Sequence, residues 1–328
     1  MTTGDFAVIS DRAIMFAGIV YALALLAHVV EWASSLSHPT RTPDRQLART
    51  GSGATVLDAT LTDADAPRGG AGDTRSLRVE TAGRAGVALT VLAAALHLVG
   101  VVTRAFATDP VRVPWGNMYE FSLAGALGVS LIYLALLRRL QLRWMGVFVA
   151  AFEVVVLMGA NLLLEQAAGP LVPALHSYWL AVHVGAAVLA TGAFSVGALA
   201  SAAYLLRDPL ERRGGSLVDM LPSGESLDRL AYRVHAVGFP LWTFAALIAG
   251  PIWAEYAWGS YWNWDPKEVW AFITWVVYAA YLHARATAGW RGRAAAVIAL
   301  IAFATLLFNF VGINFFFGAG SQHSYAGG

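Results

Sequence analysis

The fold class of this chain is decided by the stretch Trp258-Gly259-Ser260-Tyr261-Trp262-Asn263-Trp264-Asp265-Pro266-Lys267-Glu268. Six of the twelve tryptophans fall within residues 253–275, and an apolar run lies on each side of them. Indole is wide, flat and apolar with a single N–H donor, so a cluster of indoles suits either a membrane–water boundary or a flat apolar ligand with a polar edge. An ordinary aromatic belt places roughly one or two tryptophans at a helix end. The alternation of Trp262 and Trp264 through a predicted loop therefore favours a ligand platform.

The composition of the chain excludes a water-soluble globule. Of the 328 residues, 58% are hydrophobic and 13% are charged, which is typical of a polytopic membrane protein. The formal net charge of +1 provides no basic face for nucleic acid. The chain has no cysteine, so any thiol in its chemistry must belong to a partner.

The predicted fold is all-α, a polytopic integral membrane helix bundle. A helix needs about 20 residues to cross the hydrocarbon core, and eight apolar segments are long enough: about 13–36, 85–106, 119–137, 143–164, 178–206, 234–254, 268–287 and 294–317. We expect an N-terminal transmembrane helix within 1–36, a disordered cytoplasmic loop over 37–84 and a membrane core over 85–328. The loop prediction rests on its Gly, Thr, Asp and Arg content and its lack of aromatic residues.

The basic residues predict the orientation of the bundle. Loops 37–84, 138–143, 207–233 and 285–293 hold 18 of the 22 arginines and lysines, and the opposite loops hold Arg12, Arg104, Arg112 and Lys267. Because cytoplasmic loops carry the excess of positive charge, both termini are predicted to face the outer side. The tryptophan motif, which lies between the sixth and seventh predicted spans, is then on the outer side too.

Two histidines lie close to the tryptophan motif in the predicted bundle and could bind a metal there. His183 lies near the outer end of the fifth predicted span, and His323 follows the last span on the same side. Neutral imidazole binds iron, and two imidazoles from separate elements can clamp a haem from its two faces. A single histidine in a span is more often a satisfied interior residue or a proton carrier. The joint placement of His183 and His323 beside the tryptophan motif favours a pair of haem ligands.

The end of the motif predicts the start of a helix. In Asp265-Pro266-Lys267-Glu268, an N-cap residue is followed by proline at the first helical position and glutamate at the third. Asp265 can therefore act simply as a cap. A helix N-terminus also presents N–H donors and positive potential to an anion, so we expect a haem propionate here, bound with the help of Lys267.

These residues resemble a known family. The motif is similar to the WWD signature of haem-handling membrane proteins, and its Asp-Pro-Lys-Glu ending resembles the CcsA (ResC) branch of system II cytochrome c biogenesis. Four further segments resemble that branch in family order, so that the resemblance covers about residues 85–325: Trp115-Gly116-Asn117-Met118-Tyr119-Glu120, Tyr178-Trp179-Leu180-Ala181-Val182-His183, Tyr281-Leu282-His283-Ala284-Arg285 and His323-Ser324-Tyr325.

The resemblance implies a haem chaperone and a subunit of the cytochrome c haem lyase, active with a membrane protein of the CcsB (ResB) type. It implies that His183 and His323 hold haem b at the platform and that His283 belongs to a deeper haem site completed by the other subunit. His176 is a near rival to His183. The platform would comprise Trp258, Trp262 and Trp264, with Asp265 and Lys267 beside it.

The reaction implied by the resemblance is addition of the two thiols of an apocytochrome c Cys-x-x-Cys-His segment to the haem vinyl groups. Thiol-reducing proteins would then be indirect partners, and no residue of this chain is assigned as a general acid or base. The implied location is the bacterial cytoplasmic membrane, with the WWD loop on the extracytoplasmic side.

Three other functions stay open from the sequence. A b-type cytochrome of electron transfer would have paired histidines on facing helices and would not need a tryptophan-rich outer loop. A haem transporter without lyase activity fits the same motifs. The sister WWD proteins of system I are a closer alternative, although the Asp265-Pro266-Lys267-Glu268 ending and the modest length of 328 residues argue against them.

Overall fold

The computed structural model describes residues 1–36, 70–169, 177–213, 218–317 and 320–323. Within them every regular element is a helix, which confirms the predicted all-α class. The helices are α1 Thr3–Leu36, α2 Gly70–Phe106, α3 Met118–Leu137, α4 Gly146–Gly159, α5 Tyr178–Arg212, α6 Gly224–Phe244, α7 Gly250–Trp258, α8 Pro266–Thr287, α9 Arg293–Leu307 and α10 Ile313–Phe316. Short 3-10 or π segments are η1 Leu142–Met145, η2 Ala160–Leu164, η4 Val218–Met220, η5 Ala245–Ala249 and η6 Phe308–Gly312.

Seven helices of the described chain are long and apolar enough to cross a membrane. They correspond to seven of the eight predicted spans. The eighth, predicted over 268–287, forms α8, whose 22 residues extend about 33 Å at 1.5 Å per residue. This helix has the length of a span but lower apolarity, because it carries Trp270, Trp275, Tyr278 and Tyr281 in place of aliphatic side chains.

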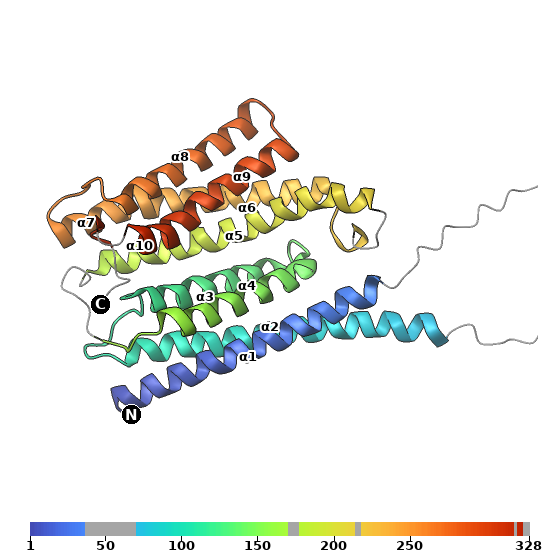
Figure 1. Cartoon of the computed structure of the whole chain (residues 1–328), viewed down its shortest axis with the longest axis horizontal. Helices are drawn as coiled ribbons and strands as arrows, with labels where there is room; N and C mark the ends of the chain where they lie inside the picture. Colours follow the sequence, from blue (N-terminus) through green and yellow to red (C-terminus); the bar gives the residue numbers. More distant parts are fainter. Residues whose placement is uncertain (37–69, 170–176, 214–217, 318–319, 324–328) are drawn as a thin grey trace, which may run out of the picture.

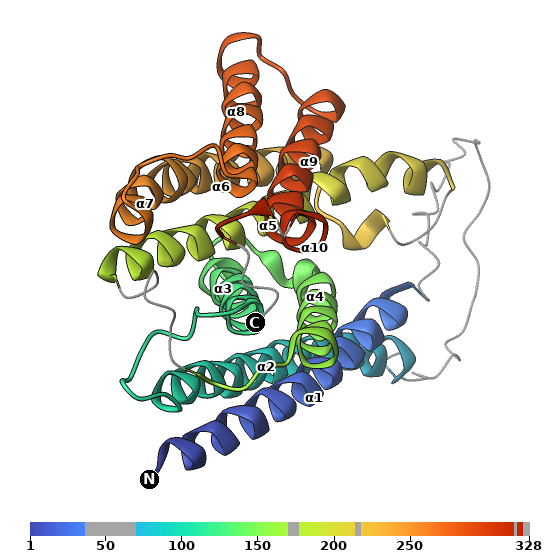
Figure 2. The ribbon, with the colours of Figure 1, turned by 60° about the vertical axis from the view of Figure 1, so that its left-hand side comes forward.

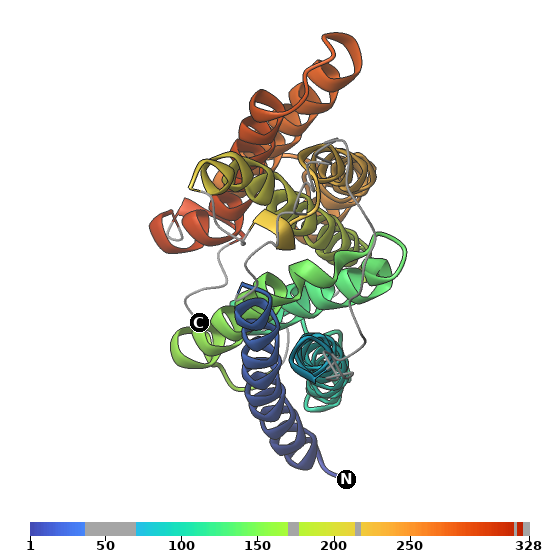
Figure 3. The same cartoon turned by 90° about the vertical axis from the view of Figure 1, so that its right-hand side faces the viewer.

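The helices are arranged in layers. Figure 1 shows α1 and α2 at one side, α8 and α9 at the other, and α3, α4, α5 and α6 between them. Seen along the bundle in Figure 3, the α1–α2 pair and the α8–α9 pair again lie on opposite sides. Figure 2 shows α9 and α10 beside α5, with α3 and α4 on its other side. Helix α5 is thus the central element of the bundle.

A close contact between α3 and α5 joins the two halves of the molecule. A Cβ atom placed on Gly192 would lie 3.1 Å from the carbonyl oxygen of Gly128 and 2.6 Å from Ile132. Any larger side chain at Gly192 would therefore force the helices apart. Because α3 and α5 carry much of the candidate site, this contact also sets its width.

The prediction of a disordered loop over 37–84 is wrong for residues 70–84, which belong to helix α2. This helix begins at Gly70 rather than near residue 85, so residues 70–84 of the predicted disordered loop 37–84 are helical. Glu80 and Arg84 form an i,i+4 ion pair of 2.7 Å, and Arg143 donates a hydrogen bond to the Val79 carbonyl at 3.3 Å. Such local and tertiary contacts extend the helix. Residues 37–69 and His176 lie outside the described residues.

The predicted grouping of the outer loops agrees with the fold. The first residues of α1, the start of α3, the start of α8 and α10 all lie at one end of the bundle (Figure 1, left). The loop before α3 and the tryptophan motif before α8 therefore lie at the same end of the bundle (Figure 1). That this end faces the outer side of the membrane stays a prediction.

Candidate functional site

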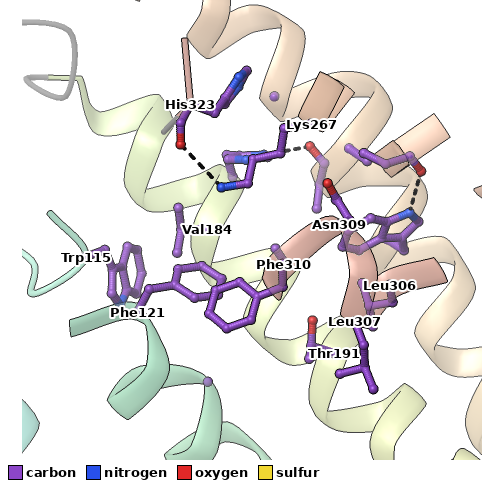
Figure 4. A pocket seen from close by; sticks show the side chains of 18 of the residues that line it. Trp115, Phe121, Val184, Thr191, Lys267, Leu306, Leu307, Asn309, Phe310 and His323 are labelled. Atoms are coloured by element: carbon purple, nitrogen blue, oxygen red, sulfur yellow. Dashed lines mark hydrogen bonds between the residues drawn. The ribbon is translucent and has the colours of Figure 1, made fainter. Parts of the chain in front are cut away.

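A cavity of about 300 Å³ lies at this end of the bundle, enclosed mainly by α3, α4, α5, η5, α7, α8, α9 and η6. Its wall is largely apolar and aromatic. The polar side chains that line it include both predicted ligands, His183 and His323, with Lys267, Glu268 and Asn309. Figure 4 shows His323 and Lys267 on one side of the cavity and the adjacent rings of Phe121 and Phe310, whose centroids are 4.7 Å apart, on another. The cavity therefore combines a flat aromatic interior with a few polar groups.

His183 is fixed in orientation by a backbone carbonyl. It lies in the second turn of α5, a helix that Ser177 caps by accepting a hydrogen bond from the Trp179 N–H. Its Nδ1 lies 2.9 Å from the carbonyl oxygen of Ala245. Ala245 opens the π-helical segment η5, and its carbonyl also accepts the Gly250 N–H in the π-helical register. Because Nδ1 of His183 donates its bond to Ala245, Nε2 keeps its lone pair and can bind a metal.

His323 lies on the tail that follows α10 and is fixed by a carboxylate. Its Nδ1 is 3.1 Å from Oδ1 of Asp265. The ring also packs edge-on against Trp253 and Trp258, with centroid distances of 5.4 and 4.5 Å. Trp253 stacks on the His183 ring from the other direction at 5.8 Å. One buried indole therefore contacts both histidines, and each histidine has its Nδ1 beside an acceptor.

Asp265 caps α8 and binds the tail at the same time. The predicted capping box is present: Oδ1 accepts the Lys267 N–H at 2.9 Å, and the Glu268 carboxylate accepts the Asp265 N–H at 3.1 Å. The same carboxylate of Asp265 accepts the Gln322 N–H at 2.6 Å and the Ser321 hydroxyl at 2.8 Å. Capping and support of His323 are therefore carried out by one side chain.

The charge state of Asp265 follows from these contacts. Burial raises the pKa of this carboxyl, but the hydrogen bond and charge of His323 and the bonds from Lys267 and Ser321 outweigh it and lower the pKa to about 2. A carboxyl with a depressed pKa stabilises the folded state at every pH above the ordinary value and loses that effect only as the pH falls toward 2. The support of His323 is thus present throughout the neutral range.

Lys267 presents its ammonium group to the cavity. Its Nζ donates to Oδ1 of Asn314 at 3.0 Å and to the carbonyl of His323 at 3.3 Å, as Figure 4 shows for the latter. Burial lowers the pKa of this ammonium to about 8, although the Asp265 carboxylate opposes the shift. Neither acceptor of the ammonium is charged, so below pH 8 the ammonium itself keeps its positive charge for an anionic ligand.

The three predicted platform tryptophans occupy different places. Trp262 lines the cavity. Trp258 contacts the His323 ring edge-on and does not line the cavity itself. Trp264 is 73% exposed, contacts Trp262 edge-on at 5.9 Å and has a left-handed backbone with φ of 57°, which is unusual for a bulky residue. The structure therefore places Trp264 outside the cavity, and Trp253 takes the central position that the sequence analysis gave to the loop tryptophans.

His283 is separate from this cavity. It lies near the C-terminal end of α8, the helix that begins at the cavity, and its side chain is exposed. The structure does not bring it near His183 or His323. Its assignment to a deeper haem site shared with another subunit stays a prediction, and its exposure leaves it accessible to such a subunit.

The buried carboxylate of Glu120 fixes the loop before α3, which forms one wall of the cavity. Glu120, only 1% exposed, accepts hydrogen bonds from Nη1 and Nη2 of Arg112 at 2.6 and 2.9 Å, from the Gly116 N–H at 2.8 Å and from Nε of Arg104 at 3.3 Å. Arg112 also donates to the Gly169 carbonyl at 2.9 Å. These bonds fix the loop that places Trp115 in the cavity wall.

Sequence reasoning missed several members of the site. Asn309 and Asn314 lie in the predicted last span, and Trp253 lies at the edge of the tryptophan cluster. A polar residue within a membrane span is a functional candidate by default, and this signal could have identified both asparagines. The contact between Trp253 and both histidines depends on the packing of α5 against α7 and was not visible in the sequence.

The sequence of this chain is similar to that of proteins of one known family. The family model described as "Cytochrome C assembly protein" matches residues 115–319. The chain belongs to the cytochrome c assembly protein family. Among relatives in this family, the cytochrome c biogenesis protein CcsA of Gloeobacter violaceus is 36% identical over 288 residues, covering 71% of this chain and 83% of the relative. CcsA of Guillardia theta is 39% identical over 234 residues, covering 65% and 76%. The resemblance to the CcsA branch is confirmed.

A solved structure of the "Cytochrome c Heme Lyase CcmF" shares the fold, with a TM-score of 0.58 and 18% sequence identity. The match covers 95% of this chain and 47% of that chain, so the present chain spans about half the length of CcmF. At this identity the likeness concerns the fold alone. The higher identity to CcsA proteins favours the CcsA branch of the family.

Proposed function

We infer that this protein is a haem chaperone and a component of a cytochrome c haem lyase, and that it presents reduced haem for attachment to apocytochrome c. One observation carries the inference: two histidines from separate elements line one aromatic cavity, and each has its Nδ1 beside an oxygen acceptor. This arrangement leaves both Nε2 atoms for iron. Membership of the cytochrome c assembly family supports the same role.

The residues of the cavity fit haem b as a substrate. The aromatic and aliphatic walls match the apolar porphyrin, and Lys267 at one edge suits a propionate. His323 lies on a tail and not on a helix facing α5, which favours transient binding over the permanent haem of a b-type cytochrome. A haem transporter without lyase activity would use the same cavity.

The reaction adds each cysteine S–H of a Cys-x-x-Cys-His segment across a haem vinyl group, so that sulfur bonds to carbon and the proton also ends on the former vinyl group. No atom is lost, and the chain supplies no thiol because it has no cysteine. Its contribution is positioning, since holding reactants in near-attack geometry removes much of the barrier. A CcsB (ResB)-type membrane protein is the proposed partner, with His283 available to it, in the bacterial cytoplasmic membrane and with the cavity on the outer side.

Thioether formation in a reconstituted system tests this function. The chain, co-purified with its CcsB (ResB)-type partner and loaded with reduced haem b, is expected to attach haem covalently to a Cys-x-x-Cys-His peptide, detected by mass spectrometry after denaturation. A Ser-x-x-Ser-His peptide is the matched control and should stay unmodified. Haem that reaches the peptide without a covalent bond would support the transporter, and haem that never leaves the chain would support the electron-transfer protein.

The pH dependence of haem binding tests the proposed role of Lys267. An anion binds the protonated ammonium more tightly, so haem affinity is expected to change little between pH 7 and 8 and to fall by up to about tenfold per pH unit above pH 8. Lys267→Arg keeps the charge throughout this range and should abolish the decline. Absorption titrations from pH 7 to 9.5 measure both proteins, and an identical decline in both would exclude Lys267 as its cause.

A further inference from the structure

The wall of the cavity contains a buried polar atom that the two-histidine arrangement does not use. Asn309 is 7% exposed, lines the cavity, and its Oδ1 has no hydrogen-bond partner within the described part of the chain. A buried acceptor without a donor costs free energy that a ligand can recover. Asn309 is therefore a candidate for direct contact with whatever occupies the cavity.

The local fold turns Asn309 toward the cavity. It belongs to η6, a π-helical segment between α9 and α10, and such segments recur at functional sites because they shift side chains out of the regular helical register. In the same region, Nδ2 of Asn314 donates to the Phe310 carbonyl at 2.5 Å, and Oδ1 of Asn314 accepts from Lys267. The two asparagines therefore differ, since Asn314 is committed to the protein and Asn309 has a free acceptor.

The surroundings of Asn309 decide the chemistry of its ligand. Leu306, Leu307 and Phe310 line the cavity close to it in the chain, and Figure 4 shows them around Asn309 while Lys267 lies further toward His323. An apolar wall disfavours a carboxylate ion. It accepts a neutral carboxylic acid, whose O–H can donate to the amide oxygen.

We propose that Asn309 binds one propionic acid group of haem in its protonated form, while Lys267 binds the other as a carboxylate. The proposal rests on the proposed function, because it requires haem in the cavity. Both acid groups project from the same edge of a porphyrin, and the cavity offers one charged and one neutral partner for them. The site thereby recognises the free acid groups of the porphyrin and not only its iron.

Haem and its dimethyl ester test the proposal, because the ester keeps the iron and the ring but has no acid O–H. The full chain in detergent is titrated with each ligand and followed by absorption. Asn309→Leu is expected to weaken haem binding roughly five- to tenfold, the range of one neutral hydrogen bond. The same variant should change ester binding by less than about twofold. Thr305→Val is the matched control, because Thr305 is a polar residue of the neighbouring α9, donates to the Ala302 carbonyl and does not line the cavity; it should change neither affinity by more than about twofold.

The outcomes separate this proposal from the proposed function. Equal weakening of haem and ester binding by Asn309→Leu would overturn the role of Asn309 and indicate a packing effect. Asn309→Ala, which introduces no new bulk, provides the same comparison if the leucine variant fails to fold. Absence of any His183-dependent haem binding by the wild-type chain would instead overturn the proposed function.

Discussion

Replacement of His183 by alanine is expected to abolish the reduced low-spin absorption spectrum of bound haem, and added imidazole is expected to restore it. The Nε2 atom of His183 is the free ligand atom on α5, because Nδ1 is held by the Ala245 carbonyl. Loss of a residue that only orients a metal ligand costs about 10- to 100-fold in affinity, so loss of the ligand itself should cost more than about 100-fold. His323→Ala should behave in the same way.

Two features make this experiment decisive. Imidazole fills the space that the deleted ring leaves and supplies the same nitrogen, so recovery of the spectrum indicates lost ligation and not misfolding. Val182→Ala is the matched control, because this neighbour of His183 is 37% exposed and does not line the cavity. Unchanged spectra in both histidine variants would mean that iron is bound elsewhere, for example at His283.

The second large effect is expected at Glu120. Its replacement by alanine leaves Arg104 and Arg112 without their shared carboxylate, and these guanidinium side chains are only 3% and 9% exposed. Breaking a buried pair by removing one partner costs about 3–5 kcal/mol. The free energy of unfolding should fall by this amount in denaturant titrations in detergent, and the loop that carries Trp115 should become accessible to protease.

An exposed pair of the same chain is the control for Glu120. Glu225 and Arg229 form an i,i+4 ion pair of 3.1 Å on α6, with side chains 78% and 56% exposed. Glu225→Ala is expected to cost less than about 1 kcal/mol, because exposed pairs are screened by water. If Glu120→Ala and Glu225→Ala lower the free energy of unfolding equally, the loop that carries Trp115 does not depend on Glu120.

The sequence was sufficient to predict features that depend on composition and on short patterns of neighbouring residues. Apolar run lengths predicted the positions of the helices, and the Asp265-Pro266-Lys267-Glu268 pattern predicted the cap of α8, because both depend on neighbours in the chain. The start of α2 was missed by about fifteen residues, since residues 70–84 are polar enough to be taken for a loop. Their helix depends in part on contacts with Arg143, which is distant in the sequence.

The candidate site was predicted only in part, for a similar reason. The sequence identified His183 and His323 by type and depth, but which tryptophan contacts both of them depends on how α7 packs against α5. Trp253 therefore could not be distinguished from Trp258, Trp262 and Trp264. The unpartnered oxygen of Asn309 depends on a π-helical register that no periodicity of the sequence predicts.

The two histidines differ in how firmly the fold holds them. His183 is part of a 35-residue helix at the centre of the bundle, whereas His323 is a latch whose described polar contacts all lead to Asp265, Lys267 and Ser321. Release of His323 would break the hydrogen bonds of the tail to the start of α8 and the ring contacts with Trp253 and Trp258, but no hydrogen bond within α5. We therefore expect a haem bound by both histidines to lose its bond to His323 before its bond to His183.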